Sequence, residues 1–221
     1  CLSGMPASQF RGGSAIMKKD VEVLCREKLG GLLGISETER IFFTSGATES
    51  MNTVLGGLDY GKSDSPILVT QTEHNSVLRP ARNIGQLKTH PVHVVKCTIN
   101  GTVSEKALEE AVCPDARVLI VNHCSNVTGC IQDMEMIRDF SRKHGLLLVV
   151  DVSQSAGCIP VEIDKWKADA AVFTGHKSLL GIQGTGGFYI RSGIKLKPLK
   201  YGGTGRNSAQ LTYENGDYEY E

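Results

Sequence analysis

The chain has 221 residues, of which 40% are hydrophobic and 22% are charged, and these fractions are typical of a globular domain with a sizeable buried core. Its 24 Lys and Arg residues balance its 24 Asp and Glu residues, so no overall field favours nucleic acid or an anionic membrane. Because no window is apolar enough for a membrane span and the start lacks a signal pattern, we expect a cytoplasmic protein with a small-molecule partner, without nucleic-acid or membrane binding.

The first predicted element is an amphipathic helix between residues 14 and 33. Apolar residues recur there at spacings of three and four, and Gly34 follows as a stop signal. These residues form one apolar stripe along the helix. Its members are Val21, Leu24, Cys25, Leu29, Leu32 and Leu33.

Strand-like and helical patterns then alternate along the chain. Strands are predicted at 41–44, 67–70, 92–95, 117–123, 146–151 and 169–174. Helices are predicted after the first two strands, at 104–112 with Ser104 as N-cap, and at 133–145 with Asp133 as N-cap and Gly145 as stop. Several strands are nearly continuous apolar runs, as burial on both faces requires. The pattern predicts a three-layer αβα fold with a mainly parallel sheet.

The stretch 186–190 follows the strand at 169–174 after a loop too short for a helical crossover, so it predicts one antiparallel strand. After Arg191 the composition changes to Lys, Pro and Gly and then to polar residues. We therefore expect a large domain over residues 1–205, whose N-terminal segment is incomplete, and a polar tail over 206–221 that leads toward a further C-terminal domain.

The seven cysteines are odd in number, scattered and without a C-x-x-C pair, which argues against a disulfide framework and against a zinc knuckle. His90 and His93 form an H-x-x-H pair, but no acidic or thiol partner lies near them in the sequence. An exposed sheet edge is therefore the preferred interpretation of this pair, and no metal site is predicted.

Polar residues follow five of the predicted strands, at the edge where open α/β sheets bind ligands. The stretch from Ser45 to Thr48 would present backbone N–H groups at a helix start, which suits a phosphate, although an ordinary helix cap gives the same pattern. Asp151 ends five apolar residues and is expected to be partly desolvated and to seek a cation or hydrogen-bond donors; a loop cap is the alternative.

Lys177 lies between a buried strand and a run of glycines. A lysine is usually a solvated surface charge, but in this position it would lose hydration, and its neutral amine could form a Schiff base with a carbonyl. A phosphate site, a carboxylate for a pyridinium nitrogen and a lysine amine together describe a site for pyridoxal phosphate.

Six motifs carry a resemblance to a known family: TSGATESMN, TEHNS, VNHCSNVTG, VVDVSQSAG, FTGHK and YGGTG. In this order they resemble the class V aminotransferases of the fold-type I pyridoxal-phosphate enzymes, most of all the cysteine desulfurase branch. The likeness runs from about Phe10 to Gly205. It implies the cofactor pyridoxal 5′-phosphate, a homodimer, cysteine as the favoured amino-acid substrate and a sulfur-acceptor protein as a further partner.

The resemblance also implies residue roles. Lys177 and His74 would be catalytic, with Lys177 bound to the cofactor as a Schiff base and His74 stacked on its ring. Asp151 would pair with the pyridinium nitrogen, and Asn126 and Gln154 would lie beside the ring oxygen. The phosphate would be held by the backbone at Ala47 and by the side chains of Thr48, Thr174 and His176.

In desulfurases of this kind, the nucleophilic cysteine and the arginine that binds the substrate carboxylate lie beyond the region represented by these 221 residues, so we expect this fragment alone to be inactive. Cys124 and Cys130 flank Asn126 and are expected to be packing residues. Alternatives are transamination or selenocysteine lyase activity, and a cofactor-binding module without turnover. A nicotinamide-binding domain is disfavoured because the glycines do not follow the first strand.

Overall fold

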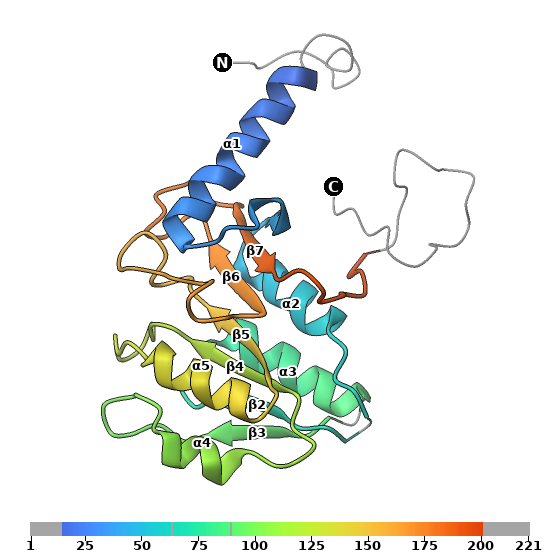
Figure 1. Cartoon of the computed structure of the whole chain (residues 1–221), viewed down its shortest axis with the longest axis vertical. Helices are drawn as coiled ribbons and strands as arrows, with labels where there is room; N and C mark the ends of the chain where they lie inside the picture. Colours follow the sequence, from blue (N-terminus) through green and yellow to red (C-terminus); the bar gives the residue numbers. More distant parts are fainter. Residues whose placement is uncertain (1–14, 63, 89, 201–221) are drawn as a thin grey trace, which may run out of the picture.

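The computed structural model describes residues 15–62, 64–88 and 90–200, and a seven-stranded sheet organises this part of the chain (Figure 1). The strand order is β1-β7-β6-β5-β4-β2-β3, and β7 runs antiparallel to both of its neighbours while the other pairs are parallel. The strands are β1 (Ile41–Thr44), β2 (Ile67–Thr70), β3 (Val92–Val95), β4 (Val118–Asn122), β5 (Leu147–Asp151), β6 (Ala170–Thr174) and β7 (Gly186–Ile190). The predicted mainly parallel sheet with one antiparallel strand is confirmed.

Helices cover both faces of the sheet. In Figure 1, α4 and α5 lie on one face, and α2 and α3 lie on the other. The helices are α1 (Ala15–Leu33), α2 (Ala47–Gly57), α3 (Asn75–Lys88), α4 (Glu105–Ala111) and α5 (Met134–Lys143), with a 3-10 turn η2 (Thr38–Arg40) before β1. The three-layer αβα prediction is therefore confirmed.

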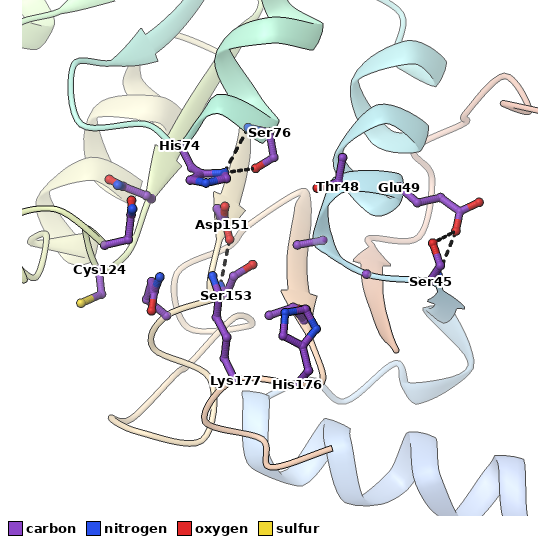
Figure 2. A pocket seen from close by; sticks show the side chains of 16 residues that line it. Ser45, Thr48, Glu49, His74, Ser76, Cys124, Asp151, Ser153, His176 and Lys177 are labelled. Carbon is purple, nitrogen blue, oxygen red and sulfur yellow. Dashed lines mark hydrogen bonds between the residues drawn. The ribbon is translucent and has the colours of Figure 1, made fainter. Parts of the chain in front are cut away.

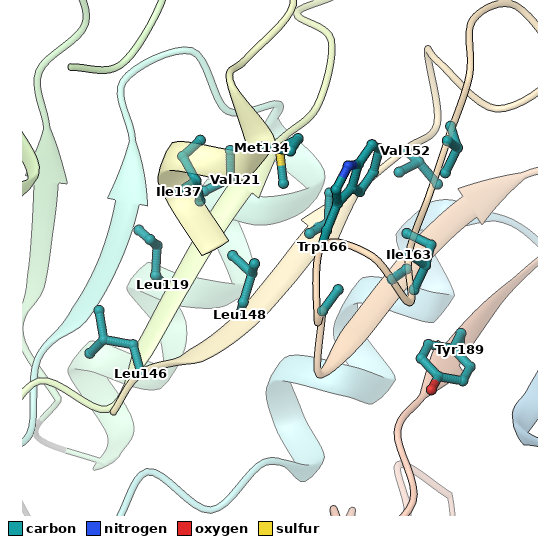
Figure 3. Close-up of a cluster of buried hydrophobic side chains, with 14 of the residues drawn as sticks. Leu119, Val121, Met134, Ile137, Leu146, Leu148, Val152, Ile163, Trp166 and Tyr189 are labelled. Atoms are coloured by element: carbon teal, nitrogen blue, oxygen red, sulfur yellow. The ribbon is translucent and has the colours of Figure 1, made fainter. Parts of the chain in front are cut away.

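The core consists of two apolar clusters, one on each face of the sheet. Alternate residues of β4 enter different clusters: Leu119 and Val121 pack beneath α5, whereas Ile120 packs on the α2 and α3 side. This division follows from the two-residue period of a strand and explains why the central strands read as continuous apolar runs. Figure 3 shows part of the α5-side cluster, including Trp166 and Ile163.

The predicted helix signals at α4 and α5 are confirmed. The Ser104 side chain accepts a hydrogen bond from the backbone N–H of Ala107, and the Asp133 side chain accepts from Glu135 and Met136. Gly145, just after α5, has a φ of +64°, a conformation that favours glycine at a helix end.

The helix predicted over residues 14–33 is confirmed as α1, and most of its apolar stripe is exposed. The helix is present, but Val21, Leu24 and Leu32 are 65%, 51% and 49% exposed, and Cys25 is also exposed. The stripe meets this chain's own core only at its C-terminal end, where Leu33 is buried and Leu29 packs against the α5-side cluster. Figure 1 shows the reason: the N-terminal part of α1 leads away from the sheet.

The H-x-x-H pair is also placed differently from the prediction. His90 is buried rather than exposed, with its Nδ1 atom 3.1 Å from the Ser65 carbonyl and its ring against Tyr60. The Nδ1 atom of His93 lies 3.3 Å from the carbonyl oxygen of Ala111. Across residues 15–62, 64–88 and 90–200, no group of three His, Cys, Asp or Glu side chains is arranged to hold a metal.

None of the described helices is long and apolar enough to cross a bilayer. The YGGTG motif (201–205), the predicted domain edge at residue 205 and the polar tail (206–221) lie outside the described residues.

Candidate active site

A cavity of about 310 Å³ opens at the carboxyl ends of the parallel strands. Its walls come from segments that follow β1, β2, β4, β5 and β6, so residues far apart in sequence meet there. This is the edge of an open α/β sheet at which ligands bind.

All nine residues predicted for the site line this cavity (Figure 2). Asp151 and Lys177, on which the cofactor hypothesis depends most, enter it from β5 and from the turn after β6. The side chain of Lys177 points toward Asp151 in Figure 2. The nine are Ala47, Thr48, His74, Asn126, Asp151, Gln154, Thr174, His176 and Lys177; their individual roles stay predictions.

The N-terminus of α2 forms one wall of the cavity. Ala47 and Thr48 belong to the first turn, whose backbone N–H groups have no intrahelical acceptor and carry the positive end of the helix dipole. A Cβ atom on Gly186 would lie 2.6 Å from the Cα atom of Gly46, so β7 passes close beneath this turn only because residue 186 is glycine.

Only part of the stretch from Ser45 to Thr48 is free to bind an anion. The backbone N–H and the hydroxyl of Ser45 both donate to Glu49, at 2.9 and 2.7 Å, and the Gly46 N–H donates to the Thr44 hydroxyl at 3.3 Å. Hydrogen bonding from Lys200, followed by that from Ser45, lowers the pKa of Glu49 to about 2. The expectation that the Ser45 and Gly46 N–H groups are free is therefore wrong, and the predicted phosphate site is reduced to Ala47 and Thr48.

Asp151 is the last residue of β5 and is 7% exposed. One carboxylate oxygen accepts a hydrogen bond from the backbone N–H of Ser153 at 2.8 Å. No Lys, Arg or His of the described ranges forms an ion pair with it. One hydrogen bond from the protein thus fixes the orientation of this buried side chain, which has no ion-pair partner in the described ranges.

Lys177 lies on a turn closed by its own backbone. The Leu180 N–H donates to the Lys177 carbonyl at 2.8 Å, and the Gly181 N–H donates to the Gly175 carbonyl at 2.7 Å. A Cβ atom on Gly175 would lie 2.3 Å from the Thr185 hydroxyl, and one on Gly181 would lie 2.9 Å from the Gly175 carbonyl oxygen. These two glycines near Lys177 therefore serve the tight closure of the turn, which aims the lysine into the cavity.

The two histidines of the site are oriented through their Nδ1 atoms. In His74 this atom accepts from the Ser76 N–H at 3.1 Å and lies 2.8 Å from the Ser76 hydroxyl. In His176 it lies 3.0 Å from the hydroxyl of Thr174, which is itself buried. Both residues are exposed and line the cavity, and these contacts fix the orientation of their rings.

Sequence reasoning missed three buried polar residues at this edge of the sheet: Glu73, His123 and Ser153. Burial, reinforced by the charge of Asp151, raises the pKa of Glu73 to about 8. Burial lowers the pKa of His123 to about 4, and its ring packs 4.5 Å from that of Trp166. All three belong to the motifs TEHNS, VNHCSNVTG and VVDVSQSAG, so the signal was their position at strand ends.

Cys124 lines the cavity, but its thiol is not activated. Burial raises its pKa, and the nearby Cys130 and Cys158 add to the effect. A raised pKa keeps the sulfur as a thiol, which is a much weaker nucleophile than the thiolate.

Residues 8–220 match the Aminotransferase class-V family, and the chain belongs to that family. Among curated relatives, it is 35% identical over 201 residues to a probable cysteine desulfurase of Methanothermobacter thermautotrophicus, covering 89% of this chain and 50% of the relative. It is 34% identical over 190 residues to the cysteine desulfurase IscS of Serratia proteamaculans, covering 85% and 46%. The chain thus spans about half the length of the curated relatives it matches.

Solved structures give the same assignment of fold. A NifS-like protein superposes with a TM-score of 0.81 and 32% identity, covering 90% of this chain and 54% of that one. The apo cysteine desulfurase of Thermococcus onnurineus NA1 gives a TM-score of 0.77 and 29% identity, covering 82% and 45%. The resemblance inferred from the six motifs is confirmed at the level of family and fold.

Proposed function

We propose that this protein binds pyridoxal 5′-phosphate and that the whole protein is a cysteine desulfurase, which converts L-cysteine to L-alanine and leaves the sulfur as an enzyme persulfide. The observation that carries the proposal is that Lys177 and Asp151 line one cavity together with the N-terminus of α2. The names of the relatives at 34–35% identity favour cysteine as the substrate.

The residues present fit this cofactor group by group. The first turn of α2 at Ala47 and Thr48, with Thr174 and His176, would hold the phosphate. Asp151 would hold the ring nitrogen, and it has no cation of its own among the described residues. A cavity of about 310 Å³ is within the range of small-ligand sites.

Further groups would complete the binding. The exposed ring of His74 would cover one face of the cofactor, and Asn126 and Gln154 would lie beside the ring oxygen. The buried hydroxyl of Ser153 has no hydrogen-bond partner in the described protein and lines the same cavity. An unpaired buried hydroxyl is unfavourable, and a polar ligand would satisfy it.

When bound, the cofactor supplies an electron sink that stabilises negative charge at the substrate α-carbon. Asp151 would keep the ring nitrogen protonated, because a buried carboxylate favours a positive partner. The amine of Lys177 would first hold the cofactor and, once released, accept the α-proton of the substrate, since it is a basic group that lines the cavity beside Asp151. The attacking thiolate would come from outside the described chain.

We also propose a homodimer and a sulfur-acceptor protein as partners. The exposed apolar residues of α1 support a second subunit, because Val21, Leu24 and Leu32 are 65%, 51% and 49% exposed and burial of such side chains against a partner is favourable. Leu180 and Ile182, in the turn after Lys177, are 90% and 78% exposed and are further apolar side chains available to a partner. Sedimentation of the full-length protein tests the dimer, and a monomer at micromolar concentration would contradict it.

The decisive experiment is the visible spectrum of the purified protein with added pyridoxal 5′-phosphate, before and after borohydride reduction, followed by mapping of the labelled peptide. We expect the label on Lys177, and the Lys177→Arg variant serves as the matched control that keeps the charge but forms no stable adduct. A label on another lysine would overturn the site assignment. Bound cofactor without alanine formation from cysteine in the full-length protein would instead reduce the proposal to cofactor binding.

A further inference from the structure

Glu73 is a buried carboxyl group directly behind the cavity wall. It is 7% exposed and lies three residues after the end of β2, next to His74. One carboxyl oxygen, Oε1, accepts hydrogen bonds from the Thr70 hydroxyl and from the backbone N–H of Asn122, the latter at 2.6 Å. The other oxygen, Oε2, is buried and has no partner in the described protein.

The Glu73 carboxyl group accepts a hydrogen bond from β4 just beyond the point where the pairing of β2 with β4 ends. The pairing of β2 with β4 ends at Val69 and Ile120, so the N–H of Asn122 has no strand carbonyl on that side. Glu73 Oε1 supplies the missing acceptor. The side chain of Asn122 adds two more bonds to the same segment, from its Nδ2 to the Thr72 carbonyl at 2.6 Å and from the Thr72 hydroxyl to its Oδ1 at 3.2 Å.

These bonds fix the segment that carries His74. Residues 72 and 73 are fastened to the last residue of β4, and His74 follows them at the cavity wall. Asn122 also pairs in register with Asp151 on β5. The same anchor therefore links the residue expected to cover the cofactor ring with the residue expected to hold its nitrogen.

The geometry favours the neutral acid form of Glu73. An ionised group here would leave a buried, charged oxygen unpaired, which is strongly unfavourable. Asp151 lies close enough for its charge to oppose ionisation of Glu73, and Asp151 is the one of the two that opens to the cavity. Because Oε1 accepts two hydrogen bonds, the proton is placed on Oε2.

We propose that Glu73 is a positioning residue of the cofactor site, which as a neutral acid fastens the His74 segment to β4 and leaves Asp151 as the carboxylate available to the ring nitrogen. The part that concerns His74 and Asp151 rests on the function proposed above. The protonation of Glu73 and its anchoring of the segment belong to the protein itself and can be measured without the cofactor.

The protonation state is tested by infrared difference spectroscopy at pH 7, in the full-length protein without added cofactor. The spectrum of the parent minus that of Glu73→Gln should contain the carbonyl stretch of a protonated carboxyl group. Glu135→Gln is the matched control, because Glu135 is exposed and paired with Lys165, and its difference spectrum should contain a carboxylate band instead. A carboxylate band for Glu73→Gln would overturn the proposal, whatever the protein binds.

The anchoring is tested by titration of the full-length protein with pyridoxal 5′-phosphate. Glu73→Gln keeps an acceptor at Oε1 and no charge, so we expect its affinity to stay within about threefold of the parent. Glu73→Leu leaves the Asn122 N–H and the Thr70 hydroxyl unpaired, and we expect affinity at least about tenfold weaker. Equal losses for both variants would mean that an ionised carboxylate is needed, and the proposal would be wrong.

A second substitution keeps the test informative if Glu73→Leu does not fold. Thr72→Val removes the bond between the Thr72 hydroxyl and Asn122 Oδ1 in a half-buried side chain of similar shape. We expect a loss of cofactor affinity of about threefold, with the infrared band of protonated Glu73 retained. Unchanged affinity in Thr72→Val together with unchanged affinity in Glu73→Gln and Glu73→Leu would rule out the anchoring role.

If the parent itself binds no pyridoxal phosphate, the proposed function fails, but the infrared result still decides the protonation of Glu73.

Discussion

Asp151 and Asp169 are both 7% exposed and lie at opposite ends of the same sheet. Asp169, just before β6, has internal partners on both oxygens: the Leu148 N–H donates to one at 2.8 Å, and the Arg191 guanidinium donates to the other. Asp151, at the end of β5, has one backbone donor and faces a cavity. Two aspartates with the same burial therefore differ in how completely the protein bonds their oxygens, and the less completely bonded one is the one that lines the cavity.

The same contrast extends to the other buried polar groups. The buried side-chain atoms that lack a hydrogen-bond partner within the described ranges are Glu73 Oε2, His123 Nδ1 and Ser153 Oγ. All three lie just after β2, β4 or β5, at the cavity edge of the sheet. The buried polar atoms without a partner thus lie at the cavity edge, where a ligand is expected. At the opposite edge of the sheet, the oxygens of Asp169 are bonded within the protein.

The largest effect is expected for Asp151→Asn. This change removes the charge proposed to hold the ring nitrogen, so desulfuration by the full-length protein should fall by two to three orders of magnitude. The free energy of unfolding should change by less than about 1 kcal/mol, because the amide oxygen can still accept from Ser153. Alanine formation and urea unfolding measure the two quantities. A large loss of stability with little loss of rate would reverse the assignment.

The Asp169→Asn variant should lose stability and keep cofactor binding, the opposite of Asp151→Asn. The Leu148 N–H and the Arg191 guanidinium would compete for one remaining oxygen, and the positive charge would lose its partner. We expect the free energy of unfolding to fall by about 2–3 kcal/mol, less than for a fully buried pair because the Arg191 side chain is 48% exposed. Cofactor absorbance at saturation should be unchanged in this variant. An altered spectrum would mean that the two ends of the sheet are coupled.

The His123→Phe variant tests the cavity end of the sheet through the pH dependence of the free energy of unfolding. Because the pKa of His123 is lowered from 6.5 to about 4 in the folded state, the unfolded chain takes up this proton at higher pH than the folded chain does. The contribution of the neutral His123 ring to the free energy of unfolding is therefore fully present above pH 6.5 and is lost as the pH falls toward 4. The loss between pH 7 and pH 5 should be about 1–2 kcal/mol smaller in His123→Phe than in the parent.

Phenylalanine is chosen because it keeps an aromatic ring against Trp166 without a titrating group. Glu73 acts in the opposite sense, since its raised pKa favours folding more as the pH falls from about 8 toward 4.5. The parent and the His123→Phe variant both contain Glu73, so its contribution cancels when their losses of stability are compared. Equal losses in parent and variant would mean that His123 does not titrate between these limits.

Much of the molecule could be predicted because local pattern and tertiary structure agree. The apolar runs of β4 and β5 encode burial on both faces, and the Asp133 cap and Gly145 stop encode the ends of α5. The cavity residues followed from the family resemblance that the motifs at strand ends carry. Their convergence is a property of parallel strands, whose carboxyl ends share one edge of the sheet.

The missed features depend on contacts that a single sequence does not encode. The exposed stripe of α1 reads like any buried helix face, since periodicity gives a face but not what covers it. The bond of Ser45 to Glu49 depends on the turn at Gly46, and the anchor of Glu73 depends on where the ladder of β2 and β4 ends. Glu73 and His123 gain their shifted pKa values only from burial that the completed fold provides.

The smallest effect is expected for Cys124→Ser, which tests whether every polar group at the cavity edge takes part in function. Its thiol donates only a long hydrogen bond, 3.8 Å to the Gly129 carbonyl, and a serine hydroxyl can replace that donor. Since burial raises the pKa of this thiol, little thiolate is present at neutral pH to attack a substrate sulfur. Sulfur release by the full-length protein should therefore stay within about threefold of the parent, an effect of the size of one weak hydrogen bond. A near-total loss, with cofactor absorbance intact, would instead make Cys124 a nucleophile of the site and place a catalytic thiol on β4's side of the cavity.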